Sequence, residues 1–154
     1  MTLHTAELSF DRSFTVSPSR LWHLLTDGNM REAWGAPSED IVLKMEISDL
    51  REGGFERHHC GPADNPEFTI DTRWYKLMED EGACYSETLV IGGESHFTSL
   101  VTYALSPKGD GCDLHVTVAV SAFGDESMIG EVQGGWEGGL AQLEKLAAAQ
   151  TAPA

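Results

Sequence analysis

Apolar and polar residues alternate along much of the chain, which is the pattern of β-strands with one buried face. Between Ile41 and Ser121 this period of two is interrupted by glycine-containing turn signals, such as residues 108–111, and it predicts about six antiparallel strands. One further strand is predicted over residues 7–16. In segments 97–105 and 114–120 the large apolar residues share one parity, so each of these strands should bury one face.

Three other segments follow a helical pattern. Ser17 offers an N-cap hydroxyl with Pro18 at the first helical position, and Asp27 can cap a second short helix that ends near Gly35. The last predicted helix covers about 125–149 and carries one apolar stripe. Its interior contains Gly130, Gly134, Gly135, Gly138 and Gly139. Together these glycines cost about 5 kcal/mol in an isolated helix, so the helix should form only when docked, and close packing is favoured over a hinge.

Composition and charge narrow the classes of function. The 154 residues suffice for one domain, predicted over 1–154 with its core at about 8–149. Ten basic and twenty-five acidic residues give a net charge of −15, which disfavours nucleic acid and anionic membrane surfaces as partners. The sequence shows neither a signal-peptide pattern nor an apolar run of membrane-spanning length, so a soluble cytoplasmic protein is expected.

The histidines and cysteines form no metal-ligand pattern. Cys60, Cys84 and Cys112 are widely spaced. His58 and His59 are neighbours on a predicted strand and therefore point to opposite faces. The nucleotide-binding, nucleophile and zinc-protease motifs are also absent from the sequence. We therefore expect no metal site and no cofactor.

The predicted order of one strand, two short helices, six antiparallel strands and a long C-terminal helix is the helix-grip order. Six segments carry a closer resemblance: FTVSPSRLWHLLTDGNMREAW (14–34), DLREGGF (49–55), TRWYKL (72–77), YSETL (85–89), TSLVTYALSPKGDGCDLHVT (98–117) and GGWEGGLAQL (134–143). Together they resemble the START-like SRPBCC superfamily, in the branch named after the activator of the heat-shock protein 90 ATPase. The resemblance implies an α+β fold in which a curved antiparallel sheet of about seven strands wraps round the C-terminal helix, with an elongated cavity between them.

The same resemblance implies functions of different classes, because members of the superfamily bind lipids, polyketides, plant hormones and other apolar molecules. The leading expectation is a domain that binds a small apolar or amphipathic ligand. One alternative is an enzyme similar to polyketide cyclases or hydrolases that uses Glu87 and His59. Another is a co-chaperone-type module that stimulates a heat-shock protein 90 ATPase, although a single predicted domain argues mildly against it. A homodimer is compatible with the sequence.

Glu87 is the most informative polar residue. It shares the strand parity of Tyr85 and of the apolar residues that follow, which places a carboxylate on a buried face. A buried carboxylate needs a partner to stay charged. Arg57 is the expected partner and His59 the second choice, provided that Phe55 on the same strand faces inward with them. A structural ion pair and a ligand-orienting or acid–base role are both open for Glu87.

The expected cavity lining combines these polar candidates with flat aromatic side chains. The ligand-binding candidates are Trp34, Phe55, Arg57, His59, Trp74, Tyr85, Glu87, Phe97, Ser99 and Trp136. Of these, Glu87 and His59 are also the catalytic candidates.

Overall fold

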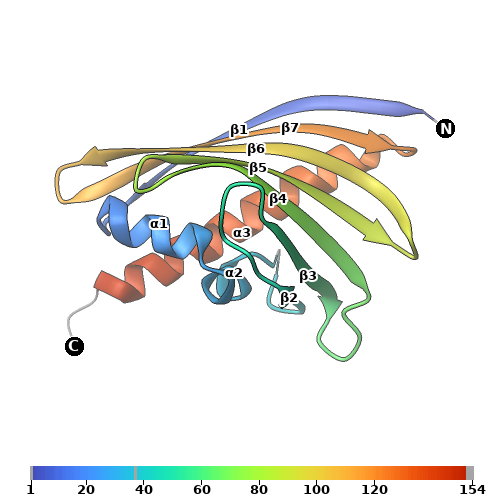
Figure 1. Cartoon of the computed structure of the whole chain (residues 1–154), viewed down its shortest axis with the longest axis horizontal. Helices are drawn as coiled ribbons and strands as arrows, with labels where there is room; N and C mark the ends of the chain where they lie inside the picture. Colours follow the sequence, from blue (N-terminus) through green and yellow to red (C-terminus); the bar gives the residue numbers. More distant parts are fainter. Residues whose placement is uncertain (1, 37, 152–154) are drawn as a thin grey trace.

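One antiparallel sheet of seven strands and three helices make up the computed structural model, which describes residues 2–36 and 38–151 (Figure 1). In chain order the elements are β1 (Leu3–Phe14), α1 (Pro18–Thr26), α2 (Gly28–Trp34), β2 (Ile41–Ile47), β3 (Phe55–Pro62), β4 (Phe68–Met78), β5 (Gly82–Ile91), β6 (Glu94–Lys108), β7 (Gly111–Phe123) and α3 (Ser127–Thr151). The predicted α+β order is therefore confirmed.

The sheet runs as a meander from β2 to β7, and β1 forms the edge beside β7. β1 begins at Leu3 rather than at the predicted Glu7, because it pairs with β7 from Leu3 opposite Phe123 to Phe14 opposite Cys112. Register shifts interrupt the pairs β2–β3, β4–β5 and β5–β6. Such bulges bend a strand and increase its twist, and the sheet curves over α3 and the two short helices (Figure 1).

The short helices begin where their capping residues predict. The Ser17 hydroxyl accepts a hydrogen bond from the backbone N–H of Arg20 at 3.1 Å. The Asp27 carboxylate accepts from the N–H groups of Asn29 and Met30 at 2.9 and 3.1 Å. Each cap satisfies amide groups that have no partner within the first helical turn. The second cap fixes the start of α2, which carries two of the residues that line the cavity described below.

α3 packs its apolar stripe into the concave side of the sheet. The buried residues of this stripe are Val132, Trp136, Leu140, Leu143 and Ala147. Gly139 faces α2, and a Cβ atom placed there would lie 3.4 Å from the carbonyl oxygen of Trp34. The expectation of close packing is therefore confirmed at Gly139. No helix within the described residues is long and apolar enough to cross a membrane.

A candidate ligand-binding cavity

A cavity of about 320 Å³ lies between α3, the end of α2 and strands β2 to β6. Its volume is in the range of sites that hold small molecules. The residues that line it include buried Arg31 and His58 as well as partly exposed Phe68 and exposed Glu131. We call the part of the lining formed by the buried polar residues the inner end. The lining thus includes both solvent-accessible residues and buried polar ones.

The walls of the cavity are mostly apolar, and four of the predicted lining residues belong to it: Trp34, Glu87, Phe97 and Trp136. Trp34 is held by a hydrogen bond of 2.7 Å from its indole N–H to the carbonyl oxygen of Leu24. Trp136 packs against Phe10, with 6.3 Å between the ring centroids. Because these aromatic side chains are fixed by contacts outside the cavity, they form preorganised walls.

Gly135 enlarges the cavity. It lines the space, and a Cβ atom at this position would meet nothing within 4 Å. Gly134 is the matching case outside the cavity, because its Cβ would also meet nothing but the residue is exposed to solvent. The glycines of α3 therefore serve different purposes, since Gly139 permits close packing and Gly135 leaves room.

Arg31 occupies the inner end of the cavity and was not among the sequence candidates. It projects from α2 and is 5% exposed. Its guanidinium lies over the ring of Tyr85, 5.3 Å from the centroid. The Nε and Nη1 atoms have no hydrogen-bond partner among the described residues. Arg31 was detectable from its spacing, because it lies three positions before Trp34 and so on the same face of a helix.

Glu87 lines the cavity opposite Arg31, and its Oε2 atom is 4.0 Å from the Nη2 atom of Arg31. The expectation of an inward-facing Glu87 with a cationic partner is confirmed, but the partner is Arg31 instead of Arg57 or His59. Burial raises the pKa of the Glu87 carboxyl, and Arg31 opposes this change only in part.

Arg57 and His59 lie on the opposite face of β3, so the expected inward parity of this strand is wrong. Arg57 donates two hydrogen bonds to Asp71, at 2.7 and 3.2 Å. The Nε2 atom of His59 is 3.3 Å from Glu46. Phe55 shares this face and contacts the guanidinium of Arg57. We refer to Glu46, Arg57, His59 and Asp71 as the outer cluster.

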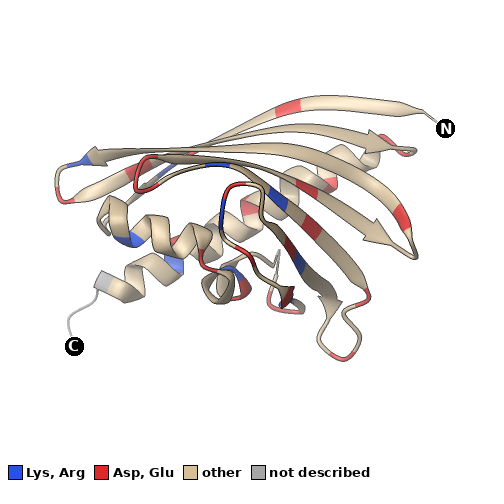
Figure 2. Ribbon diagram, viewed as in Figure 1, with Lys and Arg blue, Asp and Glu red and all other residues tan. Residues whose placement is uncertain are grey.

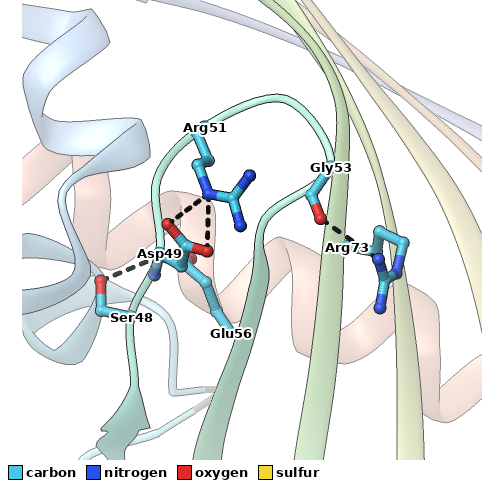
Figure 3. A network of polar contacts seen from close by, with 6 residues as sticks. All are labelled: Ser48, Asp49, Arg51, Gly53, Glu56 and Arg73. Carbon is cyan, nitrogen blue, oxygen red and sulfur yellow. Dashed lines mark hydrogen bonds and ion pairs between the residues drawn. The ribbon is translucent and has the colours of Figure 1, made fainter.

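Glu56 and His58 face the interior in place of Arg57 and His59. Glu56 is fully buried, and its Oε2 atom accepts hydrogen bonds from the Ser48 hydroxyl at 2.9 Å and from the Asp49 N–H at 3.1 Å. Figure 3 shows how the loop between β2 and β3 folds round this carboxylate, with Arg51 bound to Asp49. The Oε1 atom of Glu56 has no hydrogen-bond partner among the described residues.

His58 is neutral at pH 7. Burial lowers its pKa to about 4, and the nearby charge of Arg31 acts in the same direction. We refer to Arg31, Glu56, His58 and Glu87 as the inner cluster. Its β3 members were missed because both faces of this strand carry polar residues, so the alternation indicates no buried face.

Three further candidates lie behind the cavity wall instead of lining it. Tyr85 and Tyr103 share a hydrogen bond of 2.8 Å between their hydroxyl groups, and Trp74 packs on Tyr85 with 4.8 Å between centroids. Ser99 is buried on the adjacent strand. Burial raises the pKa of Tyr85 well above its usual value and that of Tyr103 to about 12, so both phenols stay neutral. Of these side chains, Tyr85 contacts the inner cluster, because the Arg31 guanidinium lies over its ring.

The arrangement combines apolar walls with unsatisfied polar atoms on two buried lining residues, Arg31 and His58. Buried polar groups in folded proteins nearly always have hydrogen-bond partners, and each exception calls for water or a ligand. Among the lining residues, Arg31 offers N–H donors, His58 offers ring nitrogens without a partner among the described residues, and Glu87 offers a carboxylate. Such a site can orient a molecule that has one polar end.

Comparison with known proteins identifies the fold family. Residues 15–148 match the model of the family described as activator of Hsp90 ATPase homolog 1-like protein. The chain belongs to this family, within the SRPBCC superfamily of helix-grip folds. No curated protein matches the chain.

Solved structures of bacterial proteins share this fold over nearly the whole chain. The protein Mll3558 from Rhizobium loti is 25% identical, with a TM-score of 0.80 over 94% of this chain and 99% of that one. A putative uncharacterized protein from Rhizobium leguminosarum is 20% identical, with a TM-score of 0.82 over 96% and 97%. The AHSA1 protein from Silicibacter pomeroyi is 18% identical, with a TM-score of 0.73 over 94% and 99%.

Proposed function

We propose that this protein binds a small amphipathic molecule in the cavity between the sheet and α3. The observation that carries the proposal is the combination of apolar walls with buried Arg31 and His58, which line the cavity and have unsatisfied nitrogen atoms among the described residues. The apolar walls would supply most of the binding free energy, and the polar atoms would orient the ligand. The fold of the family supports a ligand-binding domain of this class.

The alternative of an enzyme requires Glu87 and His59 to lie together at the cavity, and only Glu87 does. Glu87 lies at the cavity, whereas His59 pairs with Glu46 on the other face of β3. This separation argues against an acid–base pair of Glu87 and His59. The co-chaperone role, a homodimer and a cytoplasmic location stay predictions, and an open cavity favours ligand binding over a protein-binding module.

Filling the cavity from α3 tests the proposal. Gly135→Leu should place a side chain in the open space, and Gly134→Leu should place the same side chain in solvent. Both changes raise helix propensity by a similar amount, so the two variants should be equally well folded. The probe is 1-anilinonaphthalene-8-sulfonate, titrated into each protein and followed by its fluorescence and by isothermal titration calorimetry.

We expect the wild type and Gly134→Leu to bind one equivalent of the probe with similar affinity, and Gly135→Leu to lose at least tenfold. Native mass spectrometry of freshly purified protein should also detect a copurified small molecule on Gly134→Leu more than on Gly135→Leu. Equal probe binding by the two variants would show that the cavity is not the binding site.

A further inference from the structure

The inner end of the cavity holds a buried cation without a close counter-ion. Arg31 approaches Glu87 only to 4.0 Å, whereas charge-assisted N–H···O bonds are usually 2.7–2.9 Å long. Arg57 in the outer cluster meets that standard at 2.7 Å from Asp71. Two of the three guanidinium nitrogens of Arg31 also lack a partner among the described residues. A buried guanidinium in this state is costly unless another acceptor reaches it.

A carboxylate is the acceptor that suits these donors, because its two oxygens match the fork of a guanidinium. We propose that Arg31 binds the carboxylate of an amphipathic ligand while Glu87 takes up one proton and hydrogen-bonds to that same carboxylate. The proton comes from solvent and is shared between the two carboxyl groups. This inference rests on the proposed function, because it names the head group of the ligand in that cavity.

Charge explains why a proton should enter with the ligand. Arg31 already lies near the carboxylates of Glu56 and Glu87, and two carboxylates that share a buried site cannot easily both be ionised. Acidic side chains also far outnumber basic ones over the rest of the molecule (Figure 2). An anionic head group is therefore accommodated only when one negative charge is removed at the site.

Glu87 is the group that fits this role. Its carboxyl lines the cavity beside Arg31, and burial has already raised its pKa. Glu56 instead holds two hydrogen bonds from the loop, and Glu131 is exposed.

The other titratable groups around the inner cluster keep one protonation state near neutral pH. The pKa of His58 is lowered to about 4 by burial and by Arg31, so its ring is neutral. Burial raises the pKa of Tyr85, of Tyr103 and of the Cys60 thiol, so these groups keep their protons. Proton uptake that is present in the wild type and absent from Glu87→Gln therefore reports on Glu87.

The test is calorimetry with octanoate, octan-1-ol and octylamine as probes of equal chain length. Titrations at pH 8 in buffers of different ionisation enthalpy give the number of protons taken up for each octanoate bound. We expect about one proton for the wild type, and a loss of octanoate affinity of about tenfold for each pH unit above the pKa of Glu87. Octylamine should bind more weakly than octanoate.

Single substitutions test which residue takes up the proton and which residue binds the carboxylate of octanoate. Glu87→Gln should bind octanoate with no proton uptake and with little change between pH 6.5 and 8.5. Glu137→Gln, an exposed change of the same charge on α3, should behave like the wild type. Arg31→Met should lose at least tenfold in octanoate affinity while keeping octan-1-ol binding, and Arg57→Met should lose neither. The Arg31 and Arg57 variants are matched in chemistry and differ in the face of the molecule they occupy.

Two results separate failure of this inference from failure of the proposed function. If octan-1-ol binds but octanoate does not, or if Glu87→Gln still takes up a proton with octanoate, the head-group assignment is wrong and the cavity remains a binding site. If none of the three probes binds, the proposed function and this inference fall together. Should Arg31→Met fail to fold, the proton count of Glu87→Gln alone decides the assignment.

Discussion

The inner and outer clusters contain the same kinds of residues, and both include two residues of β3, yet their environments are opposite. In the outer cluster, Arg57 is paired with Asp71 at 2.7 Å and about a third of its side chain is exposed. In the inner cluster, Arg31 is buried and its nearest carboxylate oxygen, on Glu87, is 4.0 Å away. Satisfied polar groups at the surface stabilise a protein only slightly. Unsatisfied polar groups in the interior indicate a site where water or a ligand supplies the missing hydrogen bonds.

The largest expected effect is the loss of stability when a buried aromatic residue of the cavity wall is removed, compared with an exposed aromatic residue on the sheet. Trp136→Ala should lower the free energy of unfolding by about 3 kcal/mol or more, because a large buried side chain is removed from the cavity wall. Tyr75→Ala, at a residue that is 54% exposed on β4, should cost less than about 1 kcal/mol. Urea unfolding measures both values. A loss below about 1 kcal/mol for Trp136→Ala would mean that this residue contributes little to the core.

The next effect is a pH dependence that belongs to His58. Its pKa is lowered from 6.5 to about 4 in the folded state by burial and by Arg31. A lowered pKa stabilises the fold above pH 6.5, and this contribution of about 3 kcal/mol is lost as the pH falls toward 4. His58→Gln should remove that part of the acid sensitivity in unfolding experiments, and His59→Gln should leave it in place. Identical pH profiles for the two variants would contradict the assignment.

A third comparison concerns the stability that two glutamates contribute: buried Glu56 on β3 and exposed Glu46 on β2. Glu56→Ala should destabilise the protein by about 2 kcal/mol, because the Ser48 hydroxyl and the Asp49 N–H lose their buried acceptor (Figure 3). Glu46→Ala in the outer cluster should change stability by less than about 1 kcal/mol, since its ion pairs are half exposed. Thermal unfolding of the two variants and the wild type gives the comparison. Equal losses would show that burial does not distinguish these two carboxylates.

The smallest effect distinguishes two glycines of α3. Gly135→Ala should stabilise the protein by up to about 1 kcal/mol, because helix propensity improves and the new methyl group meets open space. Gly139→Ala should gain less, since its methyl group would reach the Trp34 carbonyl oxygen at 3.4 Å, the short limit of ordinary van der Waals contact. Denaturant midpoints measure the difference. A larger gain at Gly139 would contradict the close packing seen there.

The sequence by itself determined the element order, the capping of the short helices and the inward direction of Glu87. These features follow from local periodicity and from capping side chains, which act within a few residues. Glu87 was placed correctly because its strand neighbours include Tyr85 and several aliphatic residues on the same parity. A strand with strong apolar contrast has only one register that buries its apolar face.

Only the tertiary structure decided which face of β3 points inward, which cation pairs with Glu87 and which residues line the cavity. β3 carries charged or polar residues on both parities, so its inward face depends on how it pairs with β2 and β4. Arg31 reaches Glu87 from a helix 56 positions earlier in the chain, a distance that no local pattern spans. The open space at Gly135 likewise exists only because α3 lies across a curved sheet, since a missing side chain becomes a cavity only when walls from other elements surround it.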